Sequence, residues 1–223
     1  MDLFITQNSN YFVHRHFKFI FEKNDIHIIY VREGGRGLFK KYLEIIRNLG
    51  LLNTIYSGVL ECAYFILFAK KKKCFTSYLI DDDDLNLFLE EKLKTKLYKR
   101  VFSIGCPCKI DADLQKKYNI KIYNLHGGII PFQKGRFSPI KSLKRGHKYL
   151  GASLYLISNS FDEGHLISQD YFRKKNNNVI ENYNLVLKLS SRLLHSFLSN
   201  ELKNIPLEIL EELRKCSHLI HKK

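Results

Sequence analysis

Hydrophobic and polar positions follow one another along the chain in blocks that predict strands and helices in alternation. Short apolar runs rich in β-branched residues, followed by Gly or Pro, indicate strands. The expected strands are 25–31, 101–105, 121–126, 151–158 and 165–172. Longer segments with an apolar residue at every third or fourth position indicate helices. The expected helices are 38–49, 51–69, 85–97, 138–146, 180–200 and 206–216.

This alternation predicts an α/β protein with a mostly parallel central sheet flanked by helices, a three-layer Rossmann-like fold. The sequence contains no internal repeat and no linker rich in Pro, Gly or Ser. One main domain is therefore expected over 1–200, followed by a helical extension at 201–223. The pattern assigns no element to residues 1–24.

One long apolar segment, 51–73, approaches the length of a membrane span. It carries polar residues that a span would have to hide from lipid, namely Asn53, Thr54, Ser57, Gly58 and Glu61. We therefore expect a buried or interface helix and no membrane span, which leaves a helix-mediated homodimer open.

The cysteine pattern indicates neither a disulfide framework nor a metal site. Five cysteines are an odd number, and Cys106 and Cys108 are too close for an unstrained bridge. A C-x-C pair without a second ligand pair is weak evidence for zinc. A reducing compartment suits such a chain, and the opening residues do not form a signal peptide. The expectation is a cytoplasmic protein without a bound metal.

The chain is strongly basic, with 37 Lys and Arg against 22 Asp and Glu and a formal net charge of +15. Such a charge suits an anionic partner. Many of the lysines are scattered beside asparagines, as in "KKNNN" at 174–178, which equally fits a solvated surface. The charge alone leaves both interpretations open.

The stretch "IYNLHGGIIPFQKG", 122–135, has the clearest chemical content. Asn124 and His126 lie two positions apart at the end of an expected strand, so their side chains point to the same side. Reactive groups of open α/β sheets gather beyond the carboxyl ends of the strands. Further along, "SFDEGHLISQ" places Asp162 just before Gly164 in a second turn.

Together these motifs resemble those of the formyltransferases that use 10-formyltetrahydrofolate. The matching residues are Asn124-Leu125-His126, then Ile129-Ile130-Pro131 with Gly135, and Asp162-Glu163-Gly164. The interval from His126 to Asp162 is that of the family, Gly151 opens the strand before the Asp turn, and "GHLISQ" resembles the family's ending. The resemblance extends over about 101–172.

The resemblance implies roles for these residues. Asn124 and His126 would stabilise the developing oxyanion, and His126 and Asp162 would transfer protons. The donor 10-formyltetrahydrofolate would be held by Cys108, Lys109 and Ile110, in a segment that resembles the family's pterin-binding main chain, and by Ser158, Phe161 and Asp162. Two departures stand out: Gly127-Gly128 in the turn, and Tyr155 where relatives often carry His.

Three acceptors are compatible with this core. Glycinamide ribonucleotide enzymes carry a Gly-rich phosphate loop after the first strand, whereas here "REGGRG", 32–37, is only a weak candidate. Methionyl-tRNA enzymes append a tRNA-binding domain of roughly a hundred residues, but only about fifty follow residue 172 here, so a nucleic acid partner is not expected.

By elimination we expect a nucleotide-linked (dTDP- or GDP-) amino sugar as acceptor, formylated for surface polysaccharide. Candidate acceptor-binding residues are Lys134, Gly135, Arg136 and Tyr155, with Lys141 and Lys144 nearby. The other two acceptors remain alternatives. A non-catalytic binding protein on a decayed transferase core is opposed by the intact set of Asn124, His126 and Asp162.

Overall fold

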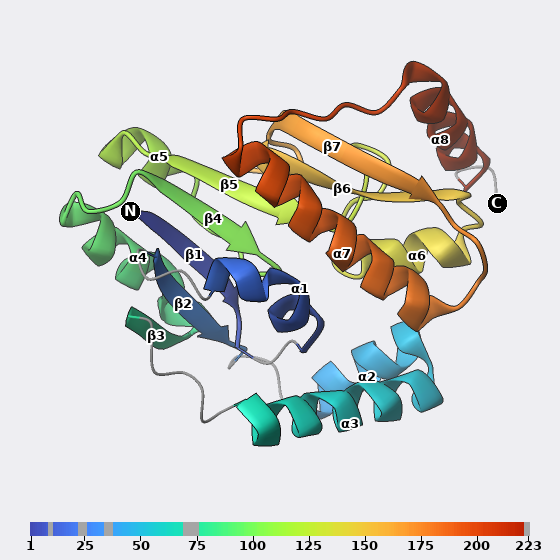
Figure 1. The fold of residues 1–223 in the computed structure, drawn as a ribbon, viewed down its shortest axis with the longest axis horizontal. Helices are drawn as coiled ribbons and strands as arrows, with labels where there is room; N and C mark the ends of the chain where they lie inside the picture. The colour runs from blue at the N-terminus through green and yellow to red at the C-terminus, as the bar shows by residue number, and fades with distance from the viewer. Residues whose placement is uncertain (9–10, 22–25, 34–37, 69–75, 221–223) are drawn as a thin grey trace. The chain divides into compact units, whose positions relative to one another are not determined.

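The structure is a computed structural model that describes residues 1–8, 11–21, 26–33, 38–68 and 76–220. Its contacts divide the chain into two compact units, Met1–Asn124 and Leu125–Lys223, called here the N-terminal and the C-terminal unit. Strand β5 (Lys121–His126) runs from one into the other. Figure 1 labels the elements of both units.

The N-terminal unit is built on a parallel sheet with β1 (Asp2–Gln7) between β2 (Ile26–Arg32) and β4 (Arg100–Ile104). Strand β3 (Thr76–Asp81) pairs with the far edge of β2. Phe4 lies opposite Ile28 and Phe102, and the rings of Phe4 and Phe102 stack at 5.1 Å. The helices are α1 (Tyr11–Phe21), α2 (Leu38–Leu49), α3 (Leu51–Phe68), α4 (Leu85–Lys94) and α5 (Asp113–Tyr118).

The C-terminal unit contains the antiparallel pair β6 (Tyr149–Leu156) and β7 (His165–Arg173). Helix α7 (Val179–Leu198) lies along this pair in Figure 1 and contacts both strands. The remaining helices are α6 (Ser138–Lys144) and α8 (Leu207–Ile220).

The C-terminal residues pack against the loop that follows His126. Ile205 and Leu213 of the last segment form one buried cluster with Ile129. Just before α8, the Lys203 carbonyl accepts hydrogen bonds from the Gln169 amide at 2.8 Å and from the Ser168 hydroxyl at 2.9 Å, at the outer edge of β7. The predicted division into a domain at 1–200 and an extension at 201–223 stays a prediction.

The predicted fold class is confirmed. The seven strands form one mostly parallel sheet in the order β3-β2-β1-β4-β5-β6-β7, with β7 antiparallel to β6. The five expected strands and six expected helices are all present, with ends shifted by a few residues. Asp84 occupies the N-cap position of α4, but its side chain makes no capping hydrogen bond.

Among the described residues of the N-terminal unit, β1, α1, β3, α5 and the short 3-10 helix η2 (Asp82–Asp84) were not predicted. Strand β1 is buried on both faces, so it reads as a brief apolar run without alternation. Helix α1 has a regular apolar face, Val13, Phe17 and Ile20, that the sequence analysis left unassigned. Helix α5 is too short to show a period.

Helix α3, expected to be buried or at an interface, exposes an apolar stripe. Its members, each more than half exposed, are Leu51, Leu52, Ile55, Tyr56 and Val59. In the described part of the chain, no helix is both long enough and apolar enough to cross a membrane. The homodimer stays a prediction.

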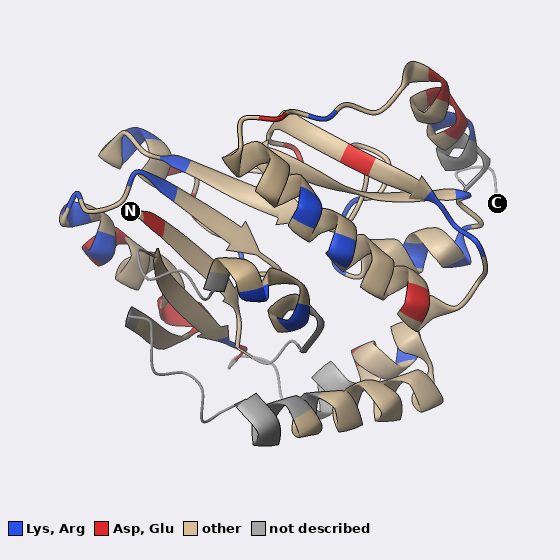
Figure 2. Ribbon diagram, viewed as in Figure 1, with Lys and Arg blue, Asp and Glu red and all other residues tan. Residues whose placement is uncertain are grey.

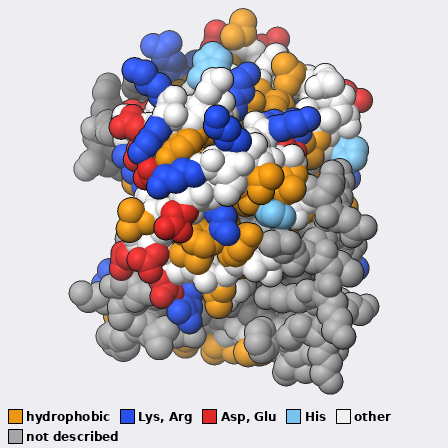
Figure 3. Space-filling view, turned by 90° about the vertical axis from the view of Figure 1, so that its left-hand side faces the viewer, with side chains coloured by type: hydrophobic (Ala, Val, Ile, Leu, Met, Phe, Trp, Pro, Cys, Tyr) orange, Lys and Arg blue, Asp and Glu red, His pale blue; other side chains and the backbone are white. Residues whose placement is uncertain are grey.

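Basic residues are distributed rather than gathered. Figure 2 shows Lys and Arg on α4, α5, α6 and α7, with Asp and Glu between them. On the face drawn in Figure 3, lysines and arginines are interspersed with acidic and hydrophobic side chains.

Candidate active site

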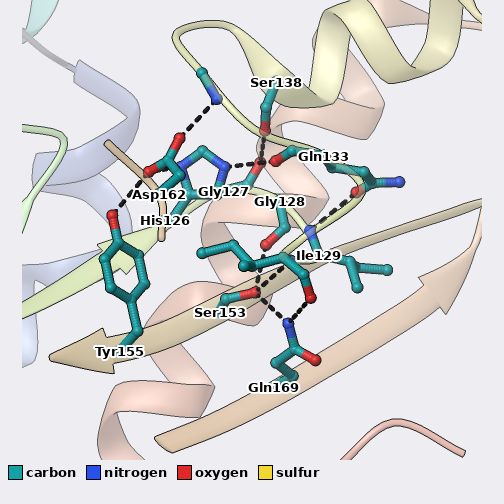
Figure 4. A network of polar contacts seen from close by, with 12 residues as sticks. His126, Gly127, Gly128, Ile129, Gln133, Ser138, Ser153, Tyr155, Asp162 and Gln169 are labelled. Atoms are coloured by element: carbon teal, nitrogen blue, oxygen red, sulfur yellow. Dashed lines mark hydrogen bonds and ion pairs between the residues drawn. The ribbon is translucent and has the colours of Figure 1, made fainter. Parts of the chain in front are cut away.

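The C-terminal unit brings together the loop after His126 and the turn that contains Asp162. His126 is the last residue of β5, and Asp162 is in the turn that joins β6 to β7. The Nδ1 atom of His126 lies 3.4 Å from Oδ1 of Asp162, with side-chain exposures of 11% and 8%. Two residues far apart in sequence thus form a nearly buried pair (Figure 4).

The Asp162 carboxylate has three neighbours that can donate to it. The Tyr155 hydroxyl donates to Oδ1 at 2.7 Å, and the Gly135 amide donates to Oδ2 at 2.6 Å. His126 approaches Oδ1 from a third direction. The backbone of Asp162 has a φ of 54°, a left-handed conformation that Asp adopts more readily than most residues. This conformation turns the carboxylate toward all three neighbours.

The second ring nitrogen of His126 is held by the loop. Nε2 lies 2.6 Å from the Gln133 carbonyl oxygen. A carbonyl can only accept, so Nε2 carries a hydrogen and donates it. The imidazole is therefore held by the loop at Nε2, and its Nδ1 lies beside Asp162.

Gln133 fixes the loop through its buried side chain. Its Oε1 accepts from the Ile129 amide at 3.1 Å, and its Nε2 donates to the Tyr149 carbonyl at 2.7 Å. The same Nε2 lies 3.2 Å from Nδ1 of His147. Burial lowers the pKa of His147, with smaller effects from Arg145 and Lys174.

A second buried network holds the start of the loop onto the sheet. The Ser153 hydroxyl donates to the Gly128 carbonyl at 2.6 Å and accepts from the Ile130 amide at 3.1 Å. The Gln169 side-chain amide donates to the Ile130 carbonyl and to Ser153, both at 2.8 Å. Figure 4 shows these contacts spanning the loop, β6 and β7.

Two glycines allow the close approach of these segments. A Cβ at Gly128 would lie 2.3 Å from the Gln133 carbonyl oxygen and 2.7 Å from Nε2 of His126. A Cβ at Gly164 would lie 1.7 Å from the Leu156 carbonyl oxygen and 2.6 Å from the Tyr155 ring. Any side chain at either position would push apart the groups that surround His126 and Asp162.

Asn124, the third residue of the predicted set, precedes His126 by two positions in β5. Alternation along the strand places the two side chains on the same side. Asn124 is half-buried. Its role stays a prediction.

The predicted acceptor-binding residues lie on or near the loop of the C-terminal unit. Lys134 pairs with Glu163 at 2.9 Å, which lowers the pKa of that exposed carboxyl. The Gly135 amide is used by Asp162, and the Arg136 guanidinium lies 5.3 Å from the centre of the Phe137 ring. Lys141 and Lys144 are on α6.

The predicted folate-binding residues belong to different units. Ser158 and Phe161 are in the C-terminal unit before Asp162, and Phe161 is 68% exposed. Cys108, Lys109 and Ile110 are in the N-terminal unit, in the loop after β4.

Asn86 of α4 holds this loop in the N-terminal unit. Its side-chain amide donates to the Lys109 carbonyl at 3.1 Å, and its Oδ1 accepts from the Asp111 amide at 2.9 Å. Within the loop, Sγ of Cys106 lies 3.8 Å from Sγ of Cys108. This hydrogen bond raises the pKa of Cys106, with burial adding to it, and lowers the pKa of Cys108.

Other predicted features fall outside this site. Most of "REGGRG" lies outside the described residues. Among the residues that are described, no three His, Cys, Asp or Glu side chains come close enough to hold a metal ion.

The sequence analysis missed the positioning residues Gln133 and Ser153. Gln169 appeared only within "GHLISQ", without a role. One signal in the sequence could have indicated such a role. Ser153 and Tyr155 are two positions apart in one expected strand, so their hydroxyls lie on the same face of the sheet.

Comparison with solved structures identifies the fold. No family model matches the sequence, and no curated protein matches it. Phosphoribosylglycinamide formyltransferase from Anaplasma phagocytophilum is 13% identical, with a TM-score of 0.57, over 86% of this chain and 80% of that chain. Glycinamide ribonucleotide transformylase 1 from Symbiobacterium toebii is 14% identical, with a TM-score of 0.58, over 86% and 82%.

A 4-N formyltransferase from Francisella tularensis is 19% identical, with a TM-score of 0.56, and the match covers 92% of this chain and 72% of that one. At such identities the likeness concerns the fold. The chain has the fold of known formyltransferases, as the motifs around Asn124, His126 and Asp162 predicted.

Proposed function

We propose that this protein is an N-formyltransferase that moves a formyl group from 10-formyltetrahydrofolate to a primary amine. The observation that carries the proposal is the nearly buried His126–Asp162 pair at the end of β5, on a fold shared with formyltransferases. Such a pair of titratable groups suits a reaction in which protons must move between two nitrogens.

The reaction defines what the site must supply. The amine nitrogen attacks the formyl carbon, and the carbonyl oxygen gains negative charge in a tetrahedral intermediate. The bond from that carbon to the folate nitrogen then breaks. The amine loses a proton and the folate nitrogen gains one, which leaves a formamide and tetrahydrofolate. Donors to the oxygen and a proton carrier are both needed.

We assign these tasks to three residues. The Asn124 amide and the His126 imidazole donate to the formyl oxygen, and His126 with Asp162 transfers the proton. In the structure, Nε2 of His126 donates to the Gln133 carbonyl. The formyl oxygen must therefore compete with that carbonyl for the same hydrogen. Catalytic contacts often shorten only when substrate is bound, which is consistent with 3.4 Å between His126 and Asp162.

For the acceptor we propose a nucleotide-linked amino sugar. The support is the cationic loop beside Asp162, with Lys134 and Arg136, which suits a diphosphate. The 4-N formyltransferase of Francisella tularensis shares the fold. Glycinamide ribonucleotide is the second candidate, because enzymes named for that acceptor match equally well in TM-score.

The test is a mass-spectrometric screen with 10-formyltetrahydrofolate and a panel of acceptors. The panel holds dTDP- and GDP-linked 3-amino and 4-amino sugars, glycinamide ribonucleotide and methionyl-tRNA. Gain of one formyl group by a nucleotide sugar supports the whole proposal. Formylation of another acceptor keeps the reaction and replaces the substrate, and a blank panel beside normal folate binding contradicts the reaction.

Variants of the pair test the assigned roles. His126→Ala and Asp162→Asn should each lower turnover by about 10²- to 10⁴-fold while the protein stays folded. His165→Ala and Asp170→Asn are matched controls on β7, because His165 is exposed and Asp170 pairs with Lys203. Either site variant retaining wild-type turnover would remove that residue from the mechanism.

A further inference from the structure

Tyr155 occupies an irregular position in the sheet. It lies on β6, 3% exposed, where the pairing of β6 with β7 shifts register between Leu154 and Tyr155. Leu154 pairs with Ser168 and Tyr155 with Leu166, which leaves Ile167 as the extra residue of a bulge. Bulges beside functional sites commonly re-aim a side chain. Here the Tyr155 hydroxyl reaches the turn that leads to β7.

The Asp162 carboxylate needs more than one hydrogen bond to keep its orientation. The terminal torsion of an Asp side chain is broad and has no sharp staggered minimum. The Gly135 amide fixes Oδ2, but one contact leaves the plane of the carboxylate free to turn. Within the described chain, the contacts of Oδ1 are the Tyr155 hydroxyl at 2.7 Å and Nδ1 of His126 at 3.4 Å. Of these two contacts, the one with the Tyr155 hydroxyl is the shorter.

We propose that Tyr155 is a positioning residue for the reaction, whose hydroxyl holds the Asp162 carboxylate so that Oδ1 faces Nδ1 of His126. The inference rests on the proposed formyl transfer and assigns to Tyr155 a role other than binding the acceptor. Its hydroxyl is already used by Asp162, and its 3% exposure leaves almost no surface for a substrate.

The arrangement of β6 supports this role. Ser153 and Tyr155 are two positions apart on the strand, so their hydroxyls lie on the same face of the sheet. Ser153 holds the loop that carries Gln133, whose carbonyl binds His126, and Tyr155 holds Asp162 (Figure 4). The absence of a Cβ at Gly164 lets the Asp162 turn lie against the Tyr155 ring. One strand thus sets the positions of both members of the pair.

The test removes the hydroxyl and keeps the ring. We expect Tyr155→Phe to lower kcat by about 10-fold, the loss typical of removing one hydrogen bond to a charged or orienting group, with KM for both substrates within about twofold. Tyr118→Phe, which likewise removes a hydroxyl that donates to a carboxylate, that of Glu90 in the N-terminal unit, is the matched control and should leave kcat unchanged. Replacing Tyr155 with p-aminophenylalanine restores an N–H donor and should recover most of the lost rate.

Three results would overturn the inference. The first is a wild-type kcat in Tyr155→Phe. The second is a change in KM alone, as expected for a substrate contact. The third is no recovery of kcat with the amino analogue. Failure of the proposed function is a different outcome, in which the wild-type protein formylates no acceptor. The crystal structure of Tyr155→Phe then decides: we expect Oδ1 of Asp162 to turn away from His126, and an unmoved carboxylate overturns the inference. If Tyr155→Phe does not fold, kcat and the crystal structure of the protein with p-aminophenylalanine at position 155 are measured instead.

Discussion

The loop 105–111 of the N-terminal unit and the His126–Asp162 region of the C-terminal unit are held in opposite ways. In the N-terminal unit, the Asn86 side chain binds the Lys109 carbonyl and the Asp111 amide in solvent-exposed contacts. Around His126 and Asp162, buried side chains from two strands and a loop interlock. Under the proposed function, the first region would offer main chain to the folate, and the second would hold groups that must meet in a reaction, which need tight positioning.

Outside the His126–Asp162 pair itself, the largest effect should come from pushing the Asp162 turn off β6. In Gly164→Ala the new Cβ would overlap the Leu156 carbonyl oxygen, so the turn must shift. A displacement of about 1 Å can cost about 100-fold in turnover, and we expect a loss of that size at saturating substrate. Gly58→Ala, where nothing lies within 4 Å of the new atom, is the control. Wild-type turnover in Gly164→Ala would show that the C-terminal region is not tightly positioned.

Removing the Ser153 hydroxyl should weaken the same region through stability. Ser153→Ala leaves the Gly128 carbonyl, the Ile130 amide and the Gln169 side chain each one partner short in a buried place. We expect the free energy of unfolding in urea to fall by about 1–3 kcal/mol. Ser199→Ala, at an exposed position, should change it little. Equal stabilities for the two variants would contradict the interlocked network.

A smaller and different effect is expected in the N-terminal unit. Asn86→Ala removes the hydrogen bonds to the Lys109 carbonyl and the Asp111 amide. We expect folate to bind about 3- to 10-fold more weakly, which is the effect of losing one or two hydrogen bonds. Turnover at saturating folate should not change. Asn53→Ala, which removes an amide that donates to the Leu49 carbonyl at the end of α2, is the control. Loss of turnover instead of folate affinity would erase the distinction between the two regions.

The smallest effect concerns pH. Because burial lowers the pKa of His147 in the folded protein, the unfolded chain takes up the proton first. Stability should therefore be full above a pH of about 6.5, the usual pKa of histidine, and decline below it by at most ~1.4 kcal/mol per pH unit. His147→Gln does not titrate, so its unfolding free energy should depend less on pH there. If the unfolding free energies of the wild type and of His147→Gln change in parallel from pH 5 to 7, His147 is not the buried neutral group described here.

Part of this architecture could be read from the sequence. Strand β5 and the Asp162 turn were recognisable because apolar runs end there at Gly-rich turns and chemically active residues. The parallel sheet followed from alternating strands and helices. Strand β1 was missed because a short strand buried on both faces has no alternation to reveal it.

The positioning contacts could not be predicted, because they depend on strand register and on how the loops fold back, which local spacing does not report. Nothing near Tyr155 in sequence indicates that its hydroxyl reaches Asp162, since that contact depends on a bulge in strand pairing. Gln133 likewise meets Tyr149 and His126 only after the loop folds back. Local patterns report faces and turns, whereas these contacts depend on register.

The packing of Ile129 against Ile205 and Leu213 has a consequence for synthesis of the protein. Ile129 belongs to the loop that carries Gln133, yet its apolar cover comes from residues translated much later. While the ribosome still holds the segment that contains Leu213, this loop lacks part of its core, although β5 has already emerged. Because domains generally fold as units during synthesis, the His126 region completes its packing only after Leu213 has left the ribosome.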